Sequence, residues 1–305
     1  MDSNAEYHVP VLLTEAIEGL RVRSDGVYVD CTFGGGGHSL GILQHLSDQG
    51  RVIAFDQDAD ARRNLPNDHR ITFVPHNFRH LKRFLRFHKI EEVDGVLADL
   101  GVSSHQFDEA ARGFSTRADK SALDMRMDQR QELTAAKVLS TLSEQQLHKL
   151  FEQYGEVTNS KTLAKTIVEG RRTSPLNTIE DFKQLVFGIV KGNPNKYFAQ
   201  VFQALRIEVN DEMGALREML EQVPDVLKAG GRVAIITFHS IEDRLVKVFF
   251  KNGTFEDTEN TDLFGKSLNK NRLEVITRKP VTPTHEEMQR NPRSRSAKLR
   301  VAEKR

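Results

Sequence analysis

Residues 26–38 constrain this chain more than any other part of its sequence. A β-type run at 27–29 ends in the acid Asp30, and four consecutive glycines at 34–37 precede a predicted helix. Because glycine has no Cβ, such a loop turns sharply and lets the backbone approach a ligand closely. The helix then offers N–H groups without intrahelical partners in its first turn. A glycine-rich turn from strand to helix is typical of nucleotide-cofactor sites.

The acids around this loop indicate which ligand it binds. A dinucleotide fold expects Gly-x-Gly-x-x-Gly and a pyrophosphate at the helix N-terminus. Here the glycines are contiguous and Asp30 precedes them, which disfavours a phosphate and favours a cationic ligand such as S-adenosylmethionine, with its ammonium and sulfonium groups. A second acid, Asp56, ends the next β-run, at about the distance of 20 residues where an acid typically binds ribose hydroxyls. Nicotinamide enzymes share that second acid, so it is Asp30 and the glycine spacing that favour S-adenosylmethionine over a nicotinamide cofactor. A plain glycine-rich turn without a ligand would not need both acids.

The first third of the chain alternates between strand-like and helix-compatible runs. Such alternation predicts a parallel sheet with helices on both faces, hence an α/β fold. The predicted strands here are 27–30, 51–56, 70–75 and 94–99.

The alternation stops after the fourth predicted strand. From about residue 105 to 203 the chain is polar and helix-like, and strand-like sequence returns only after an amphipathic helix predicted at 211–228. We therefore predict one domain made of residues 1–105 and 204–305, interrupted by a helical insertion at 106–203. Three later strands at 230–238, 273–277 and 298–301 bring the sheet to seven.

Ligands of open parallel sheets bind at the carboxyl ends of the strands. Asp99 ends the fourth predicted strand, where an acid either accepts a ligand or handles a proton, although a turn-forming Asp is the common alternative. Asn77 is a candidate for the adenine edge and Phe78 for its face, and Phe78 could equally be a core aromatic. His239, at the end of the fifth strand, precedes a predicted Ser-capped helix and could still face the pocket.

The positions of cysteine and histidine limit which methylation reactions and which metal sites the sequence allows. Carbon-5 methylation of a pyrimidine needs a thiolate near the fourth or sixth strand end, but the single cysteine, Cys31, lies in the glycine loop. Nitrogen or oxygen methylation remains. His76 and His80 have the spacing of a metal pair but no third ligand, so we predict no metal.

The bulk composition predicts a protein of a reducing compartment, the cytoplasm, without a signal peptide or membrane span. The net charge of +1 makes no case for nucleic acid. The segment 290–305 is strongly basic, which from charge alone is more typical of a solvated tail than of a phosphate contact.

Several long motifs resemble those of one known family, the bacterial 16S rRNA cytosine-N4 methyltransferases of the methyltransferase H (MraW) type, and the match runs nearly end to end. The motifs are His8-Val-Pro-Val-Leu-Leu, Asp30-Cys-Thr-Phe-Gly-Gly-Gly-Gly-His38, Asp99-Leu-Gly-Val-Ser-Ser104, Arg112-Gly-Phe-Ser115, Leu123-Asp-Met-Arg-Met-Asp128, Phe202-Gln-Ala-Leu-Arg-Ile-Glu-Val-Asn210, Thr237-Phe-His-Ser-Ile-Glu-Asp-Arg244 and Asn291-Pro-Arg-Ser-Arg-Ser296.

The resemblance implies a seven-stranded, Rossmann-like S-adenosylmethionine-dependent methyltransferase fold with a substrate-recognition insertion. It implies methylation of the N4 amine of a cytidine in the decoding region of 16S rRNA, on the assembled small ribosomal subunit. The cofactor positions that carry over are Gly36, Gly37, His38, Asp56, Phe78, Asp99 and Gln106, beside Asp30. Many amino-methyltransferases have Asp/Asn-Pro-Pro-Tyr/Phe after the fourth strand, where this chain has Asp99-Leu-Gly-Val. Asp99 is therefore either the catalytic acceptor or a cofactor ligand only.

An RNA substrate gives the basic segments a role. Phosphate contacts position RNA, while shape and flipped-base contacts specify it. The arginines predicted to contact RNA are Arg126, Arg293 and Arg295, with Arg112, Arg117 and Lys120 as further candidates in the insertion.

Three other functions stay open at this point. A nicotinamide oxidoreductase conflicts with Asp30 and the contiguous glycines. A small-subunit assembly factor that retains a cofactor pocket stays open as well, although the intact loop and both acids indicate that the cofactor is still used. A methyltransferase of proteins or small molecules would not need the basic tail. The sequence does not decide between a monomer and a homodimer.

Overall fold

The computed structural model describes residues 10–256 and 271–305, so His8 and Val9 of the first motif lie outside the described residues. Contacts divide the chain into two compact units. The sheet unit comprises Met1–Gly101 and Ala215–Arg305, and the helical unit comprises Val102–Gly214. The boundary predicted at residues 203 and 204 falls inside a helix, α9 (Pro194–Asn210), that belongs wholly to the helical unit.

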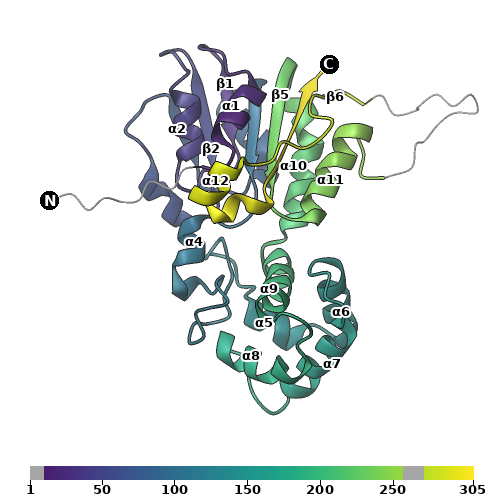
Figure 1. Cartoon of the computed structure of the whole chain (residues 1–305). Helices are drawn as coiled ribbons and strands as arrows, with labels where there is room; N and C mark the ends of the chain where they lie inside the picture. The colour runs from purple at the N-terminus through teal and green to yellow at the C-terminus, as the bar shows by residue number, and fades with distance from the viewer. Residues whose placement is uncertain (1–9, 257–270) are drawn as a thin grey trace, which may run out of the picture. The chain divides into compact units, whose positions relative to one another are not determined.

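The sheet unit is built on seven strands in the order β3-β2-β1-β4-β5-β7-β6. Strands β1, β2, β5 and β6 are labelled in Figure 1. Four of the pairings, from β3 to β5, are parallel, whereas β7 is antiparallel to both β5 and β6. The sheet is therefore mixed rather than purely parallel, with the α/β methyltransferase architecture expected. The strands are β1 (Val27–Asp30), β2 (Arg51–Phe55), β3 (Ile71–Val74), β4 (Val93–Asp99), β5 (Leu227–Thr237), β6 (Leu273–Val275) and β7 (Lys298–Lys304).

Helices cover both faces of this sheet. Side chains of α1 (Leu13–Leu20) and α2 (Gly37–Leu43) share one buried cluster with Val52, Ala54 and Ile236. The alternate residues of a strand point to the opposite face, and there Phe55 meets Phe84 of α3 (Leu81–Phe87) edge to face.

The other helices of the sheet unit complete its layers. Gln222 lies in α10 (Glu212–Val226), which belongs to the sheet unit from Ala215 onward. It bonds to the backbone of Arg79 and Lys82, which places α10 beside α3. The remaining ones are α11 (Ser240–Asn252) and α12 (His285–Arg290), with the 3₁₀ turns η1 (Ala59–Asn64), η2 (Phe78–His80) and η5 (Pro292–Ser296).

The helical unit has a core of its own. Apolar side chains from its helices form one buried cluster that includes Phe151, Phe182 and Phe202. The helices, seen in Figure 1, are α4 (Ser104–Asp108), α5 (Ala135–Thr141), α6 (Glu144–Gln153), α7 (Ser160–Gly170), α8 (Ile179–Val186) and α9, with 3₁₀ turns η3 (Ala110–Arg112) and η4 (Phe187–Ile189). Ser143 and Thr178 start α6 and α8 with capping boxes, which satisfy backbone donors that a helix start leaves open.

In the part of the chain that the structure describes, no helix combines the length and apolarity that a membrane crossing requires.

Candidate functional site

The strand order reverses between β1 and β4, because β2 and β3 lie on one side of β1 and β5 lies beyond β4. Open α/β sheets bind ligands outside the carboxyl ends of the strands at such a point. Asp30 and Asp99 are the last residues of these two adjacent strands. The topology thus brings together two acids that are far apart in the sequence.

Asp30 organises the glycine loop from beneath. Its side chain is fully buried; Oδ1 accepts a hydrogen bond from the Thr32 N–H at 3.0 Å and Oδ2 accepts one from the Ser39 hydroxyl at 2.7 Å. Both oxygens are used within the fold, so the contact that we predict between Asp30 and the cofactor stays a prediction.

The loop itself combines a left-handed turn with close packing. Gly36 has φ +79°, which favours glycine, and forms the N-cap of α2. A Cβ on Gly37 would lie 2.2 Å from Cγ of Pro10, whereas a Cβ on Gly35 would meet nothing within 4 Å. One side of the loop is therefore packed on the N-terminal segment and the other is open to a ligand.

Asp56 ties the second strand to this loop. Its Oδ2 accepts from the Gly34 N–H at 2.7 Å and its Oδ1 from the Asp58 N–H at 2.8 Å. Burial raises the pKa of Asp56 to about 6, against the lowering effect of these N–H groups and with a further rise from the charges of Asp58 and Asp30. The side chain is positioned after β2, where a ribose-binding acid is expected.

The third strand contributes a short capped turn. Asn77 caps η2, accepting from the Arg79 N–H at 2.9 Å, and donates to the Gln57 side chain at 2.8 Å. Phe78 is half-buried at the start of that turn. The adenine contacts proposed for Asn77 and Phe78 stay predictions.

Asp99, unlike Asp30 and Asp56, has a carboxyl oxygen that accepts no hydrogen bond from the described residues. Its backbone N–H donates to Thr32 Oγ1 at 2.7 Å, but its side-chain Oδ1 is buried without a hydrogen-bond partner. Burial raises the pKa of Asp99 to about 6; His38 lowers it, and the charges of Asp30 and Glu242 raise it. A buried acceptor without a partner is costly unless a ligand supplies a donor or a charge.

Two histidines flank this acid cluster. His38 contacts Asp99 from α2, with Nδ1 3.7 Å from Oδ2. His239 caps α11, and its Nε2 lies 3.1 Å from Oε1 of Glu242, whose Oε2 accepts from the Phe238 N–H at 3.0 Å. His239 and Glu242 therefore lie side by side at the end of β5, and Nε2 of His239 has no hydrogen-bond partner in the part of the chain that the structure describes.

Arg293 and Arg295 lie at the same edge of the sheet. They belong to η5, which immediately precedes β7. Since β7 is antiparallel to β5 and Lys298 pairs with Thr237, η5 lies next to the carboxyl end of β5. Both arginine side chains are exposed, so this basic turn can face a polyanion bound at the ligand edge.

The other predicted site residues, Gln106 and Arg126, lie in the helical unit. Gln106 is buried in α4, where its side-chain oxygen accepts from the Ser103 N–H at 3.1 Å as half of a capping box. Its cofactor contact stays a prediction.

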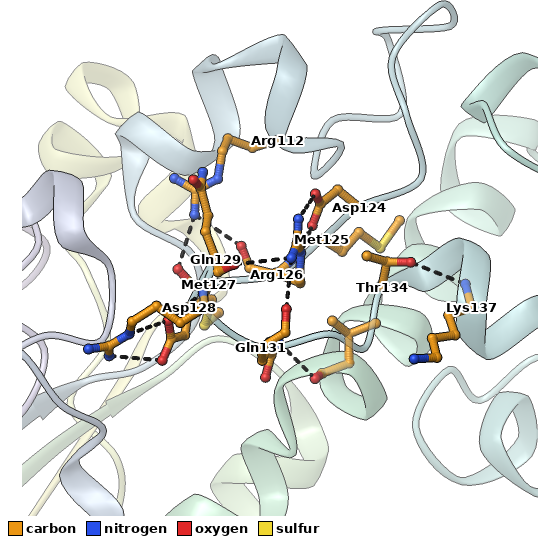
Figure 2. Close-up of polar contacts among 12 residues, drawn as sticks. Arg112, Asp124, Met125, Arg126, Met127, Asp128, Gln129, Gln131, Thr134 and Lys137 are labelled. Carbon is orange, nitrogen blue, oxygen red and sulfur yellow. Dashed lines mark hydrogen bonds and ion pairs between the residues drawn. The ribbon is translucent and has the colours of Figure 1, made fainter.

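Arg126 holds together the loop at 123–128 (Figure 2). Its guanidinium group donates to both oxygens of Asp124 at 2.8 Å, and to the carbonyls of Gln129 at 3.1 Å and Gln131 at 2.7 Å. The partners are Asp124 within the loop and two residues that follow it, so Arg126 positions this loop, and its predicted RNA contact stays a prediction.

Two side chains outside this loop bond its backbone, a role that the sequence did not reveal. Arg112, a phosphate candidate, is buried and donates to the carbonyls of Arg126 and Met127 at 3.0 and 3.1 Å. Asn210 of α9 accepts from the Met127 N–H at 2.7 Å and donates to the Met125 carbonyl at 2.8 Å. The signal in the sequence was that all these residues fall in the unusual motifs named above.

Within the described ranges, no three His, Cys, Asp or Glu side chains gather in a way that could hold a metal ion. His76 stacks on the Phe84 ring with centroids 4.5 Å apart.

A model of the "MraW methylase family" matches residues 5–305. The chain is 52% identical to ribosomal RNA small subunit methyltransferase H of Bacteroides thetaiotaomicron, covering 98% of this chain and 97% of that one, and 53% identical to the protein of the same name from Parabacteroides distasonis, with the same coverage.

Among solved structures, a putative rRNA-methylase from Clostridium thermocellum aligns over 97% of this chain and 99% of its own with TM-score 0.46 and 11% identity. This is a distant likeness, and the relationship rests on the sequence relatives.

Proposed function

This chain belongs to the MraW methylase family and is an S-adenosylmethionine-dependent ribosomal RNA methyltransferase; we propose that it methylates the exocyclic N4 of a cytidine in the decoding region of 16S rRNA. The observation that carries the proposal is the juxtaposition of the glycine loop and Asp99 at the reversal of strand order.

The residues at this edge fit the cofactor. The open side of Gly35 leaves room for the ligand, and the buried, unpartnered Oδ1 of Asp99 leaves an acid whose charge a cation would compensate. Bound there, S-adenosylmethionine supplies a methyl group activated by the positive sulfonium. Asp56 is suited to accept the ribose hydroxyls, and Asp30 fixes the loop on which the cofactor rests.

The state of Cys31 favours an amine over carbon 5 as the acceptor. The thiol is buried, and burial, with the nearby charge of Asp30, raises its pKa well above the ordinary value. The thiol therefore stays protonated, and it is the only cysteine in the sequence. Asp99, at the end of β4, is the acid suited to accept the N–H of an exocyclic amine.

The partner that we propose is the assembled small ribosomal subunit. The exposed Arg293 and Arg295 at the ligand edge suit phosphate contacts. The helical unit, with its braced loop at 123–128, is the part proposed to recognise the target nucleotide and its surroundings.

The first test incubates the purified chain with methyl-labelled S-adenosylmethionine and three substrates: small subunits lacking the modification, naked 16S rRNA, and bulk tRNA. Label recovered from subunits as N4-methylcytidine supports the proposal. Label in 5-methylcytidine, or transfer only to tRNA, contradicts it. Light scattering of the subunit complex counts whether one chain or two are bound.

A second test asks whether the basic turn contacts phosphate. We expect Arg293→Ala/Arg295→Ala to weaken subunit binding and to reduce the slope of log affinity against log salt by about one to two. Calorimetric affinity for S-adenosylmethionine should not change. The matched control is Arg83→Ala/Arg86→Ala, which removes the same charge from two exposed arginines of α3. Equal effects of the two variants would contradict a specific contact.

A further inference from the structure

The hydrogen bonds of His38 fix which of its ring nitrogens carries a proton. Nε2 lies 3.0 Å from the carbonyl oxygen of Val11, and the ring is buried. A carbonyl oxygen can only accept, so Nε2 is the donor, and in the neutral ring Nδ1 is a bare lone pair.

That lone pair faces a second acceptor. Nδ1 lies 3.7 Å from Oδ2 of Asp99, whose side chain is 24% exposed. An imidazole lone pair and a carboxylate oxygen repel each other at this distance where little water screens them. One proton between them, on either group, converts the repulsion into a hydrogen bond or an ion pair. The geometry therefore favours a pair that holds one proton.

The surrounding groups strengthen this tendency. The titratable groups that face Asp99 are His38 from α2, Asp30 from β1 and Glu242 from α11. Two of the three are acids, and they disfavour another negative charge at Asp99. A cation placed at the strand edge has the opposite effect and favours the loss of the proton.

We propose that His38 and Asp99 share one proton whose retention depends on the charge of the bound ligand. The pair is deprotonated beside the cationic methyl donor and takes up a proton when the methyl group, and with it the positive charge, has left the sulfur.

The charges balance across the reaction. The acceptor nitrogen forms a bond to the methyl carbon, the carbon–sulfur bond breaks with its electron pair going to sulfur, and the nitrogen loses one proton. Asp99 takes that proton, with Nδ1 of His38, 3.7 Å from Oδ2, as the nearby acceptor. The charges of the sulfonium and of Asp99 then sum to zero both before and after transfer. This inference rests on the proposed function, since it assumes an amine as the methyl acceptor.

Proton release on ligand binding tests the inference without any RNA or turnover. Isothermal titration of the full chain with S-adenosylmethionine and with S-adenosylhomocysteine, in buffers of different ionisation enthalpy, gives the protons released by each. With the pKa of Asp99 at about 6, we expect S-adenosylmethionine to release about half a proton more than S-adenosylhomocysteine at pH 6, and almost none more at pH 8. Asp56 also titrates near pH 6, but both ligands carry the same ribose, so its contribution cancels in the difference.

Two variants assign the proton to the pair. In Asp99→Asn the difference between the ligands should vanish. In His38→Gln, whose amide can still donate to Val11, it should persist with a shifted midpoint, because the second group that holds the proton is gone. His38→Gln also decides the matter if Asp99→Asn fails to bind.

Equal proton release by the two ligands in the native chain overturns the inference. So does a ligand difference that survives Asp99→Asn, or a profile that His38→Gln leaves unchanged. Methylation of subunits together with equal proton release would refute the shared proton alone. No transfer to N4 in the labelling test would refute the proposed function instead.

Discussion

At the scale of single residues, Asp99 represents a conflict between stability and ligand binding. Its folded-state pKa of about 6 lies above the ordinary aspartate value of 3.8 because the carboxyl group is buried. A carboxyl group whose pKa is raised by folding binds its proton more tightly in the folded state. The stability that it contributes is therefore complete below about pH 4 and is lost as pH rises through 6. Above that pH the carboxylate is a destabilising group, as is expected of a residue retained for binding rather than for stability.

We therefore expect Asp99→Asn to stabilise the ligand-free chain at pH 8 by roughly 1 to 3 kcal/mol and to leave it unchanged at pH 4. Denaturant unfolding across this pH range measures the effect. Asp243→Asn is the control of opposite sign, since Arg300 overcomes the effect of burial and lowers the pKa of Asp243. That substitution should destabilise the chain at pH 8. A destabilised Asp99→Asn at pH 8 would show that the carboxylate is supported in the fold.

The glycines of the loop separate packing from ligand binding. Gly37→Ala should destabilise the chain by about 1 to 3 kcal/mol, because its Cβ would overlap Pro10. Gly35→Ala should keep the melting temperature but weaken cofactor binding, because its Cβ enters the open side. Thermal melts and calorimetry on both variants measure this. Loss of stability in Gly35→Ala would mean that no ligand space exists there.

At the scale of elements, the loop at 123–128 is held by side chains rather than by regular structure. Met125 is buried with φ 62°, a conformation unusual for a residue with a Cβ, and Arg126, Arg112 and Asn210 bond its backbone neighbours. Such a backbone persists only where its surroundings over-determine it.

Replacing Arg126 with Lys keeps the charge but loses the planar fork that reaches Asp124 and two carbonyls. We expect a loss of about 1 to 3 kcal/mol in the stability of the helical unit and reduced methylation of subunits. Arg130→Lys is the control, because Arg130 also pairs with an acid, Asp128, but is 57% exposed. Native stability of Arg126→Lys with weakened subunit binding would instead assign Arg126 to the RNA.

These elements also show what the sequence could and could not predict. The strand at 27–30 was predicted to the residue, because an apolar run ended by an acid and a glycine loop leaves one solution. β5 begins at Leu227 rather than at residue 230. The early start was not predicted because Lys228 and two glycines are residue types that are depleted in strands. The loop at 123–128 was not foreseen, because Asn210 is more than 80 residues away from the groups that it bonds.

At the scale of the whole molecule, the chain leaves the sheet unit after Gly101 and returns at Ala215. The glycine loop, Asp56 and Asp99 all lie in the sheet unit, and each unit has its own buried core. Independent cores of this kind are the mark of separately folding domains. The division suggests that cofactor binding and substrate recognition can be separated physically.

We expect a chain in which a flexible Gly/Ser linker replaces residues 102–214 to fold cooperatively and to bind S-adenosylmethionine. Because Gln106 is absent, the affinity should fall by at most about tenfold, which corresponds to one lost hydrogen bond of about 1.4 kcal/mol. Binding to small subunits and methylation should be lost. In the full chain, Gln106→Ala should reproduce the loss in cofactor affinity but retain subunit binding. Complete loss of cofactor binding in a folded linker variant would mean that the helical unit supplies more of the cofactor site than Gln106. Subunit binding at native strength would place recognition in the sheet unit, where Arg293 and Arg295 lie.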